Sequence, residues 1–315
     1  LENRDFKNWK EKDIVPITTP RPGHADLTGA LKYGYRELRL SLERGSARET
    51  AMRVAVGAVC KQFLAQFGIE ILGYVTQIGA IKAHIDENPD YRALFDCAES
   101  NDVRSPDAAA AEEMHAEIRQ AKIDKDTLGG VFEVSALNVP PGLGSHVHYD
   151  RRLDAKLVAM MTSIQAMKGA EIGHAFDNAG KPGSQVHDHM EPDGNGGIQR
   201  RTNRAGGLEG GITTGDPIIV RVAMKPISTM LQGADTVDLA TGEAQRTVYE
   251  RSDFCAVPRA VPVGEAMMAI ALTDALIEKL GGDSLAEMRP RFDNLPRNSF
   301  ADLPMDNVEW RFGYE

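Results

Sequence analysis

Two pairs of histidines are the first residues in the chain that could do chemistry. His146 and His148 stand one residue apart in a Pro/Gly loop, and His187 and His189 flank Asp188 in a glycine-rich stretch. Imidazoles and carboxylates at such short spacing are typical ligands of zinc and similar ions. A metal-dependent hydrolase is one function they would support. Short histidine pairs in loops more commonly make hydrogen bonds within turns, so the metal site stays an alternative.

A lysine and two hydroxyls form a second candidate site, in the segment Lys225, Pro226, Ile227, Ser228 and Thr229. This segment follows a predicted strand over residues 217–225. A lysine, hydroxyls and free backbone N–H groups at a strand end suit a phosphate group, which they bind through charge-assisted hydrogen bonds. The glycine-rich turns over residues 206–211 lack the spacing of a dinucleotide fingerprint, and the chain has no Walker A sequence. An ordinary surface turn accounts for the lysine segment equally well.

Charged side chains also gather on three loops rich in Gly, Pro and Ser. They are Arg21 with His24, Arg44 and Arg48 around Ser46, and Arg251 with Asp253. Ser46 and Glu49 have the spacing of a capping box, so the two arginines next to them flank a predicted helix start, where backbone N–H groups and the helix dipole favour an anion. Each arginine alone is as consistent with a surface ion pair. Together they indicate a site for a ligand with several negative charges.

The elements that position these residues follow from hydrophobic periodicity. Apolar residues at helical spacing predict helices over residues 27–45, 49–68, 106–125, 150–167 and 263–279. Branched and alternating runs predict strands over residues 69–78, 129–138, 170–175 and 217–225. The two kinds of element come in mixed order without a βαβ rhythm or an internal repeat. We therefore expect one α+β domain over residues 1–315.

Composition and charge exclude several classes of protein. The 315 residues include 36 basic and 46 acidic side chains, a net charge of −10, which disfavours a surface built for nucleic acid or an anionic membrane. The most apolar run, residues 266–276, is interrupted by Thr273 and Asp274 and falls short of a membrane span. Three cysteines without a C-x-x-C pair indicate neither a disulfide framework nor a zinc ribbon. They fit a reducing compartment, and we expect a cytoplasmic protein.

At these candidate residues the sequence resembles the chorismate synthase family. The matching segments are residues 21–27 (RPGHADL), 43–54 (ERGSARETAMRV), 142–153 (GLGSHVHYDRRL), 167–173 (MKGAEIG), 202–215 (TNRAGGLEGGITTG), 225–229 (KPIST) and 251–267 (RSDFCAVPRAVPVGEAM). The resemblance implies a β-α-β sandwich, with helices between antiparallel sheets, assembled as a homotetramer. It implies a lyase that converts 5-enolpyruvylshikimate 3-phosphate to chorismate and phosphate by 1,4-elimination. Reduced FMN is the implied cofactor, and it lends electron density to C–O cleavage before a proton leaves C6.

The resemblance also assigns roles to individual residues. It implies that His24 protonates or hydrogen-bonds the reduced flavin, and that Asp253 lies near flavin N5 and helps to take the C6 proton. The implied flavin contacts are Arg44, Gly45, Ser46, Gln165, Ala166, Gly210, Lys225, Pro226, Ile227, Ser228, Thr229 and Arg251. Arg21, Arg48 and Arg251 are the charges expected to face the anionic groups of the substrate. Under this interpretation His146 and His148 line the pocket or support the loop.

One part of the family pattern is absent. Members begin with a segment that carries a Gly-Glu-Ser-His-Gly motif, whose histidine is thought to protonate the leaving phosphate, and residues 1–9 resemble the sequence just after it. We therefore expect a chain that lacks about 80 N-terminal residues of the family, the size of a small domain. We also expect this chain alone to be poorly active. A catalytically inactive module that binds flavin or another anion is the remaining alternative.

Overall fold

A five-stranded antiparallel sheet is the centre of the computed structural model, which describes residues 15–87, 89–247, 253–303, 305–306 and 308–309. The strands run in the order β2-β1-β3-β9-β4. Their bounds are β1 Glu70–Ile78, β2 Ile81–Lys82, β3 Gly130–Leu137, β4 Met167–Ile172 and β9 Ile218–Met224. Every neighbouring pair is antiparallel. The three strands expected over residues 69–78, 129–138 and 217–225 are confirmed, and the strand expected over 170–175 begins three residues earlier.

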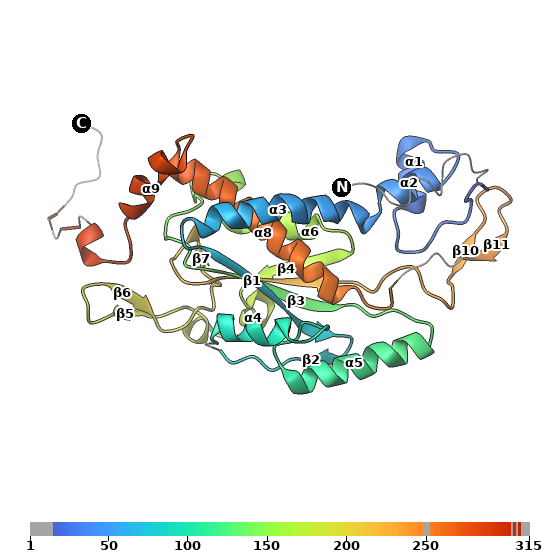
Figure 1. Cartoon of the computed structure of the whole chain (residues 1–315), viewed down its shortest axis with the longest axis horizontal. Helices are drawn as coiled ribbons and strands as arrows, with labels where there is room; N and C mark the ends of the chain where they lie inside the picture. Colours follow the sequence, from blue (N-terminus) through green and yellow to red (C-terminus); the bar gives the residue numbers. More distant parts are fainter. Residues whose placement is uncertain (1–14, 88, 248–252, 304, 307, 310–315) are drawn as a thin grey trace.

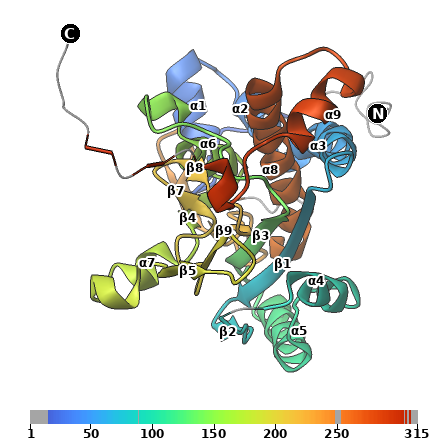
Figure 2. The same cartoon turned by 90° about the vertical axis from the view of Figure 1, so that its left-hand side faces the viewer.

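Helices cover both faces of this sheet (Figures 1 and 2). The long helix α8 packs against β1 and β3 on one face, together with α3 and α6, while α4 and α5 lie on the other face. Their bounds are α3 Thr50–Ala65, α4 Tyr91–Glu99, α5 Ala108–Ile123, α6 Leu153–Thr162 and α8 Val257–Leu280. The architecture is α+β, as expected from the mixed order of elements.

Alternation along β3 shows how the sheet separates its two faces. Phe132, Val134 and Ala136 are fully buried members of the main hydrophobic core, and an added Cβ on Gly264 of α8 would lie 2.6 Å from Phe132. Glu133 and Ser135 alternate with them and therefore point to the opposite face. Both are buried as well, so the second face also excludes water.

Helix α8 is apolar and long enough to cross a membrane by length and composition, but 72% of its most apolar window is buried inside the protein. It packs against α3, α6, β1 and β3. A helix that is packed on several sides is hydrophobic all round, so burial within the fold accounts for the apolar composition of α8.

The helix expected over residues 27–45 is wrong as one element, because the chain forms two helices there. These are α1 Asp26–Tyr33 and α2 Arg39–Arg44. Gly34 ends α1 with φ +67°, a left-handed conformation that suits glycine and stops a helix. The two helices lie beside the small sheet of β10 (Asp235–Val237) and β11 (Ala244–Arg246) at one end of the molecule (Figure 1).

The remaining elements are short and lie mostly in segments expected to be loops. They are α7 Ala175–Asn178, α9 Leu285–Asp293, β5 Met190–Pro192, β6 Ile198–Arg200, β7 Leu208–Glu209 and β8 Ile212–Thr213. The periodicity analysis also missed α4, whose N-cap Asp90 accepts hydrogen bonds from the backbone of Arg92 and Ala93. The capping box expected at Ser46 is only half formed, since its side chain accepts from Arg48 N at the start of a 3₁₀ turn that leads into α3.

Candidate active site

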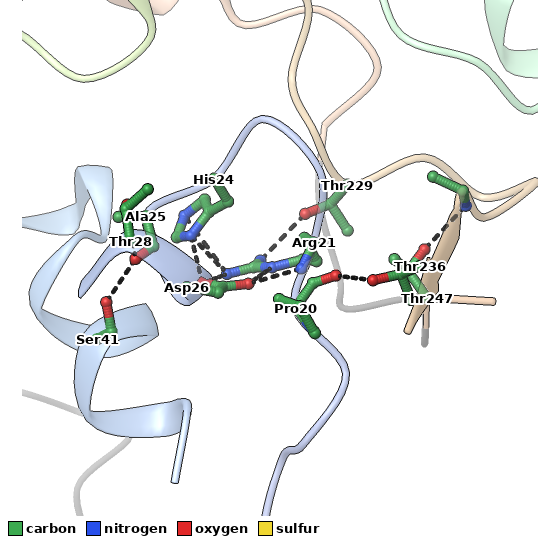
Figure 3. Close-up of polar contacts among 11 residues, drawn as sticks. Pro20, Arg21, His24, Ala25, Asp26, Thr28, Ser41, Thr229, Thr236 and Thr247 are labelled. Atoms are coloured by element: carbon green, nitrogen blue, oxygen red, sulfur yellow. Dashed lines mark hydrogen bonds and ion pairs between the residues drawn. The ribbon is translucent and has the colours of Figure 1, made fainter. Parts of the chain in front are cut away.

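Arg21, His24 and Asp26 form a compact charged cluster at the start of α1 (Figure 3). The Asp26 carboxylate accepts hydrogen bonds from Arg21 Nε at 2.9 Å, from Arg21 Nη2 at 3.1 Å and from Arg21 N at 3.1 Å. His24 Nδ1 lies 2.5 Å from Asp26 Oδ1. Burial opposes the ionisation of Asp26, but the hydrogen bonds from His24 and Arg21 outweigh it and hold its pKa well below the usual range. Asp26 is therefore a carboxylate at neutral pH.

This cluster touches the segment after β9, about 200 residues further along the chain. Arg21 Nη1 donates to Thr229 Oγ1 at 3.2 Å (Figure 3). A Cβ added to Gly23, whose φ is +76°, would lie 3.6 Å from Ser228 Cβ and 3.7 Å from Lys225 Nζ. The loop over residues 21–24 and the segment Lys225–Thr229, which were selected separately in the sequence, thus lie side by side.

Lys225 is a half-buried cation. Burial and the nearby charge of Lys168 both lower its pKa below the ordinary value. Among the residues that the structure describes, no carboxylate forms an ion pair with it. A partly desolvated ammonium without an anionic partner is energetically unfavourable, so the position is suited to a negatively charged ligand.

Gln165 and Ala166 join the same region through the backbone of Lys225. Lys225 N donates to Ala166 O at 3.0 Å. Ala166 has φ +67°, an uncommon conformation for a residue with a Cβ, and such strained positions cluster at functional sites. The side-chain oxygen of Gln165 is buried without a hydrogen-bond partner in the described part of the chain. Its amide nitrogen donates to Glu49 Oε1 at 2.5 Å, which ties it to the segment before α3.

The segment before α3 completes this region. A Cβ added to Gly45 would lie 3.3 Å from Ala25 Cβ and 3.6 Å from His24 Cε1, so only a very small residue lets the two loops approach this closely. Arg44 and Arg48 are exposed here on either side of Ser46. The structure therefore brings together residues from four distant segments, which are 21–24, 44–46, 165–166 and 225–229. We refer to this set as the cationic cradle.

Asp253 stands four residues before α8, in a segment that is linked to the cradle through the backbone. Its carboxylate contacts Arg259 Nη1 at 2.5 Å. The next residue, Phe254, accepts a hydrogen bond from Leu128 N, and a Cβ on the adjacent Gly129 would lie only 2.8 Å from Pro226 N. The backbone at Asp253 is thus linked through residues 128–129 to the lysine segment. Arg251, the other residue expected here, lies outside the described residues.

Gly210 is not brought to the cradle within one copy of the chain. It lies in the turn between β7 and β8, before β9, whereas Lys225 follows β9. The seven residues of β9 span about 23 Å at about 3.3 Å per residue. Figure 1 accordingly places β7 well away from α1 and α2, toward the end of the molecule that carries β5, β6 and α9. The nearest atom to a Cβ on Gly210 would be His146 Cβ, at 3.9 Å.

The histidine pairs do not form a metal site. His146, His148, His187 and His189 are all exposed. Within the described ranges, no three His, Cys, Asp or Glu side chains are grouped so that they could hold a metal ion. The metal-dependent hydrolase considered from spacing alone therefore has no site in this part of the chain.

Sequence reasoning missed two features. One is Asp26, an acid two residues after a loop histidine, which is a usable but weak signal. The other is a cavity of about 210 Å³ on the sheet face covered by α4, whose lining includes Tyr91, Glu133, His174 and Arg221. It contains none of the expected site residues. No sequence pattern marks it, because its lining comes from separate strands and loops.

Comparisons with known proteins show which proteins this chain is similar to. The family model described as chorismate synthase matches residues 1–277. The chorismate synthase of Aquifex aeolicus is 50% identical over 310 residues, which cover 93% of this chain and 78% of that protein. The chorismate synthase of Syntrophotalea carbinolica is 52% identical over 298 residues, which cover 92% of this chain and 76% of that protein. A crystal structure of a chorismate synthase, 48% identical, superimposes with a TM-score of 0.75 over 86% of this chain and 75% of the other.

Proposed function

The chain belongs to the chorismate synthase family, and we propose that the cationic cradle is the place where it binds its flavin and its substrate. Members of this family are lyases that convert 5-enolpyruvylshikimate 3-phosphate to chorismate and phosphate with reduced FMN, and this chain is a lyase of that kind. The observation that carries the site proposal is the convergence of Arg21, His24 and Lys225 from segments about 200 residues apart.

The residues of the cradle fit a flat, phosphorylated cofactor. Lys225 has no carboxylate partner among the described residues and suits a phosphate. The unpartnered Gln165 Oε1 is a buried acceptor that a ring N–H would satisfy. Gly23 and Gly45 let the loop over residues 21–24 lie close to the lysine segment on one side and to the segment before α3 on the other.

We assign the binding of FMN to the cradle residues Arg44, Gly45, Ser46, Gln165, Ala166, Lys225, Pro226, Ile227, Ser228 and Thr229. Arg251 and Gly210 remain predictions from the family pattern, the first outside the described residues and the second remote within one copy. When bound, reduced FMN supplies electron density that helps the substrate C–O bond to break. The chain supplies orientation, charge and proton transfer around it.

The charged residues have two further roles, which are binding of the substrate and proton transfer. We assign contacts with the anionic groups of the substrate to Arg21 and Arg48, since guanidinium groups bind phosphate and carboxylate in bidentate fashion, and the same role for Arg251 remains a prediction from the family pattern. His24 is suited to exchange a proton with the bound ligand, because an imidazole both donates and accepts near neutral pH. We propose Asp253 as the carboxylate that receives the proton lost from the substrate, and its contact with Arg259 helps to orient it.

Replacement of His24 tests this assignment. We expect His24→Ala to lower turnover by about 10²-fold or more, the usual contribution of a positioned acid or base, while FMN affinity changes by less than about threefold. His115, which pairs with the exposed Asp102 outside the cradle, is the matched control, and His115→Ala should leave turnover unchanged. Near-normal turnover of His24→Ala in the protein expressed from its own gene would refute the role of His24.

The assembly and compartment are proposals as well. We propose a homotetramer, on the family resemblance, and light scattering of the purified protein measures its mass directly. A cytoplasmic location is supported by the few unpaired cysteines, all three of which are free in the structure. The substrate is a small molecule.

A further inference from the structure

We propose that Asp26 is a positioning residue that holds Nδ1 as the protonated ring nitrogen of His24, so that Nε2 is the atom that exchanges a proton in the site. This inference rests on the proposed role of His24. Asp26 was not among the residues selected from the sequence. Its contacts are with Arg21 and His24 (Figure 3).

The first step is the protonation state of Asp26. Its side chain is only 1% exposed and accepts three hydrogen bonds from Arg21. A carboxylate with a pKa this low is ionised, and an ionised carboxylate only accepts hydrogen bonds. A ring nitrogen 2.5 Å from its Oδ1 must therefore be the donor. His24 Nδ1 carries a proton in this arrangement.

The second step concerns the contact between Arg21 and the same ring. Arg21 Nη2 lies 3.0 Å from Nδ1 and 3.4 Å from Nε2 of His24. The lone pairs of the two ring nitrogens diverge, so one donor cannot be aligned with both. Nδ1 already donates to Asp26, and a guanidinium group has no acceptor. The Arg21 group therefore lies against the ring, and its positive charge is balanced by the Asp26 carboxylate that it contacts.

The third step is rigidity. Asp26 lies in the first turn of α1, which is held against α2 because Ser41 Oγ donates to Ala25 O at 2.7 Å. A Cβ on Gly29 would lie 1.9 Å from Ser41 Oγ, so the two helices are in very close contact. On the other side, Thr236 Oγ1 donates to Pro20 O at 2.6 Å (Figure 3). The carboxylate is thus fixed by packing on both sides of the loop.

This arrangement determines which proton moves. The proton on Nδ1 stays on the ring and in its hydrogen bond with Asp26. Nε2 receives one proton from the site to give an imidazolium and later returns it to give the neutral ring. One proton is thus taken up and one released in each cycle. A buried carboxylate behind an imidazole fixes the tautomer and stabilises the imidazolium without itself taking up the proton.

The test begins with a measurement that does not depend on activity. In protein labelled with ¹⁵N-histidine, with His24 assigned by its loss in His24→Gln, we expect one protonated nitrogen, at Nδ1, and one unprotonated nitrogen above the pH where the ring titrates. Asp26→Asn removes the negative charge and turns one acceptor oxygen into an NH2 donor. With the remaining oxygen held by Arg21 N and Nε, the NH2 faces His24 Nδ1, which must then act as an acceptor, so we expect the Nδ1–H signature to be lost. Asp102→Asn breaks an exposed Asp–His contact elsewhere and is the matched control.

Turnover separates positioning from a general structural role. Because a positioned acid or base contributes about 10²–10⁴-fold, we expect Asp26→Asn to lower kcat by about 10- to 100-fold. In a His24→Ala background the same change should alter kcat by less than about twofold. If Asp26→Asn also changes KM because Arg21 loses its partner, that change in KM should still be seen in the His24→Ala background. An equal loss of kcat in both backgrounds would show that Asp26 does not act through His24.

The outcomes remain distinguishable from those of the proposed function. If His24→Ala keeps normal turnover, the proposed role of His24 fails, whatever the NMR spectrum shows. If His24→Ala is impaired but Asp26→Asn is not, only the positioning role fails. Should Asp26→Asn not fold, the wild-type spectrum still decides, since a His24 ring protonated at Nε2 and bare at Nδ1 overturns the proposal.

Discussion

Removal of the Lys225 charge should have opposite effects on ligand binding and on the stability of the unliganded protein. The ammonium is half-buried, and burial together with Lys168 lowers its pKa. In Lys225→Met the apolar stem is largely retained and the charge is lost. A charge-assisted hydrogen bond contributes about 1.5–3 kcal/mol. We take the lower part of this range, about 1.5–2 kcal/mol, because solvent reaches the group, and expect FMN to bind about 10- to 30-fold more weakly.

The sign of the stability effect follows from the same pKa shift. Since the pKa of Lys225 is lower in the folded state, the unfolded chain binds more protons between that value and the ordinary value of 10.5. The free energy of unfolding should therefore rise with pH across this window in the unliganded protein. Lys225→Met removes this rise, and below the window it should be at least as stable as the wild type.

Two titrations measure both effects. Fluorescence quenching gives the affinity for FMN, and denaturant unfolding at a series of pH values gives the free energy of unfolding. Lys168→Met is the matched control, since Lys168 is an exposed neighbour on β4 and should change FMN affinity by less than about threefold. The reasoning is refuted if both variants lose affinity equally, or if Lys225→Met destabilises the unliganded protein below the window.

Three further predictions concern the proton acceptor, the core and the metal alternative. Asp253→Asn should lower turnover by about 10²-fold or more with FMN affinity nearly unchanged, and a parallel loss of both would argue against its role. Gly57→Ala should lower the melting temperature by about 1.5–3 °C, because its new methyl would lie 2.3 Å from Ala266 Cβ and 2.5 Å from the backbone Cα of Ala266. Such overpacking falls in the upper part of the range, about 2–3 kcal/mol, and exceeds the helix-propensity gain of about 1 kcal/mol, whereas the exposed Val59→Ala should shift the melting temperature little. Treatment with EDTA should leave turnover unchanged, and a loss restored by added zinc would revive a metal site.

Much of the sheet and of the helix layer could be predicted from the sequence, because their apolar residues recur at regular periods. The bounds of α5 and β9 follow from such patterns to within two residues. The break between α1 and α2 could not, since the apolar spacing continues across Gly34 and only its left-handed backbone ends the helix. Helix α4 was missed because it is short and half exposed.

The candidate site shows a similar division. Residue types on separate loops, such as Arg21 and Lys225, indicated an anionic ligand, and the family resemblance joined them into one site. The side-chain contacts that fix the site required the structure. Gln165 contacts Glu49 across 116 residues, and Asp26 acquires its importance only from the geometry of two neighbouring side chains. For Gly210 the sequence suggested a contact that one copy of the chain does not form. The family motif grouped it with Lys225, but the two residues lie at opposite ends of β9.

The central claim is tested most directly by anaerobic mixing of the protein, expressed from its own gene, with reduced FMN and 5-enolpyruvylshikimate 3-phosphate. We predict release of one phosphate for each chorismate formed, with the flavin reduced at the end as at the start, and loss of this activity in His24→Ala but not in His115→Ala. Absence of phosphate release, or release that is unaffected by His24→Ala, would contradict the account.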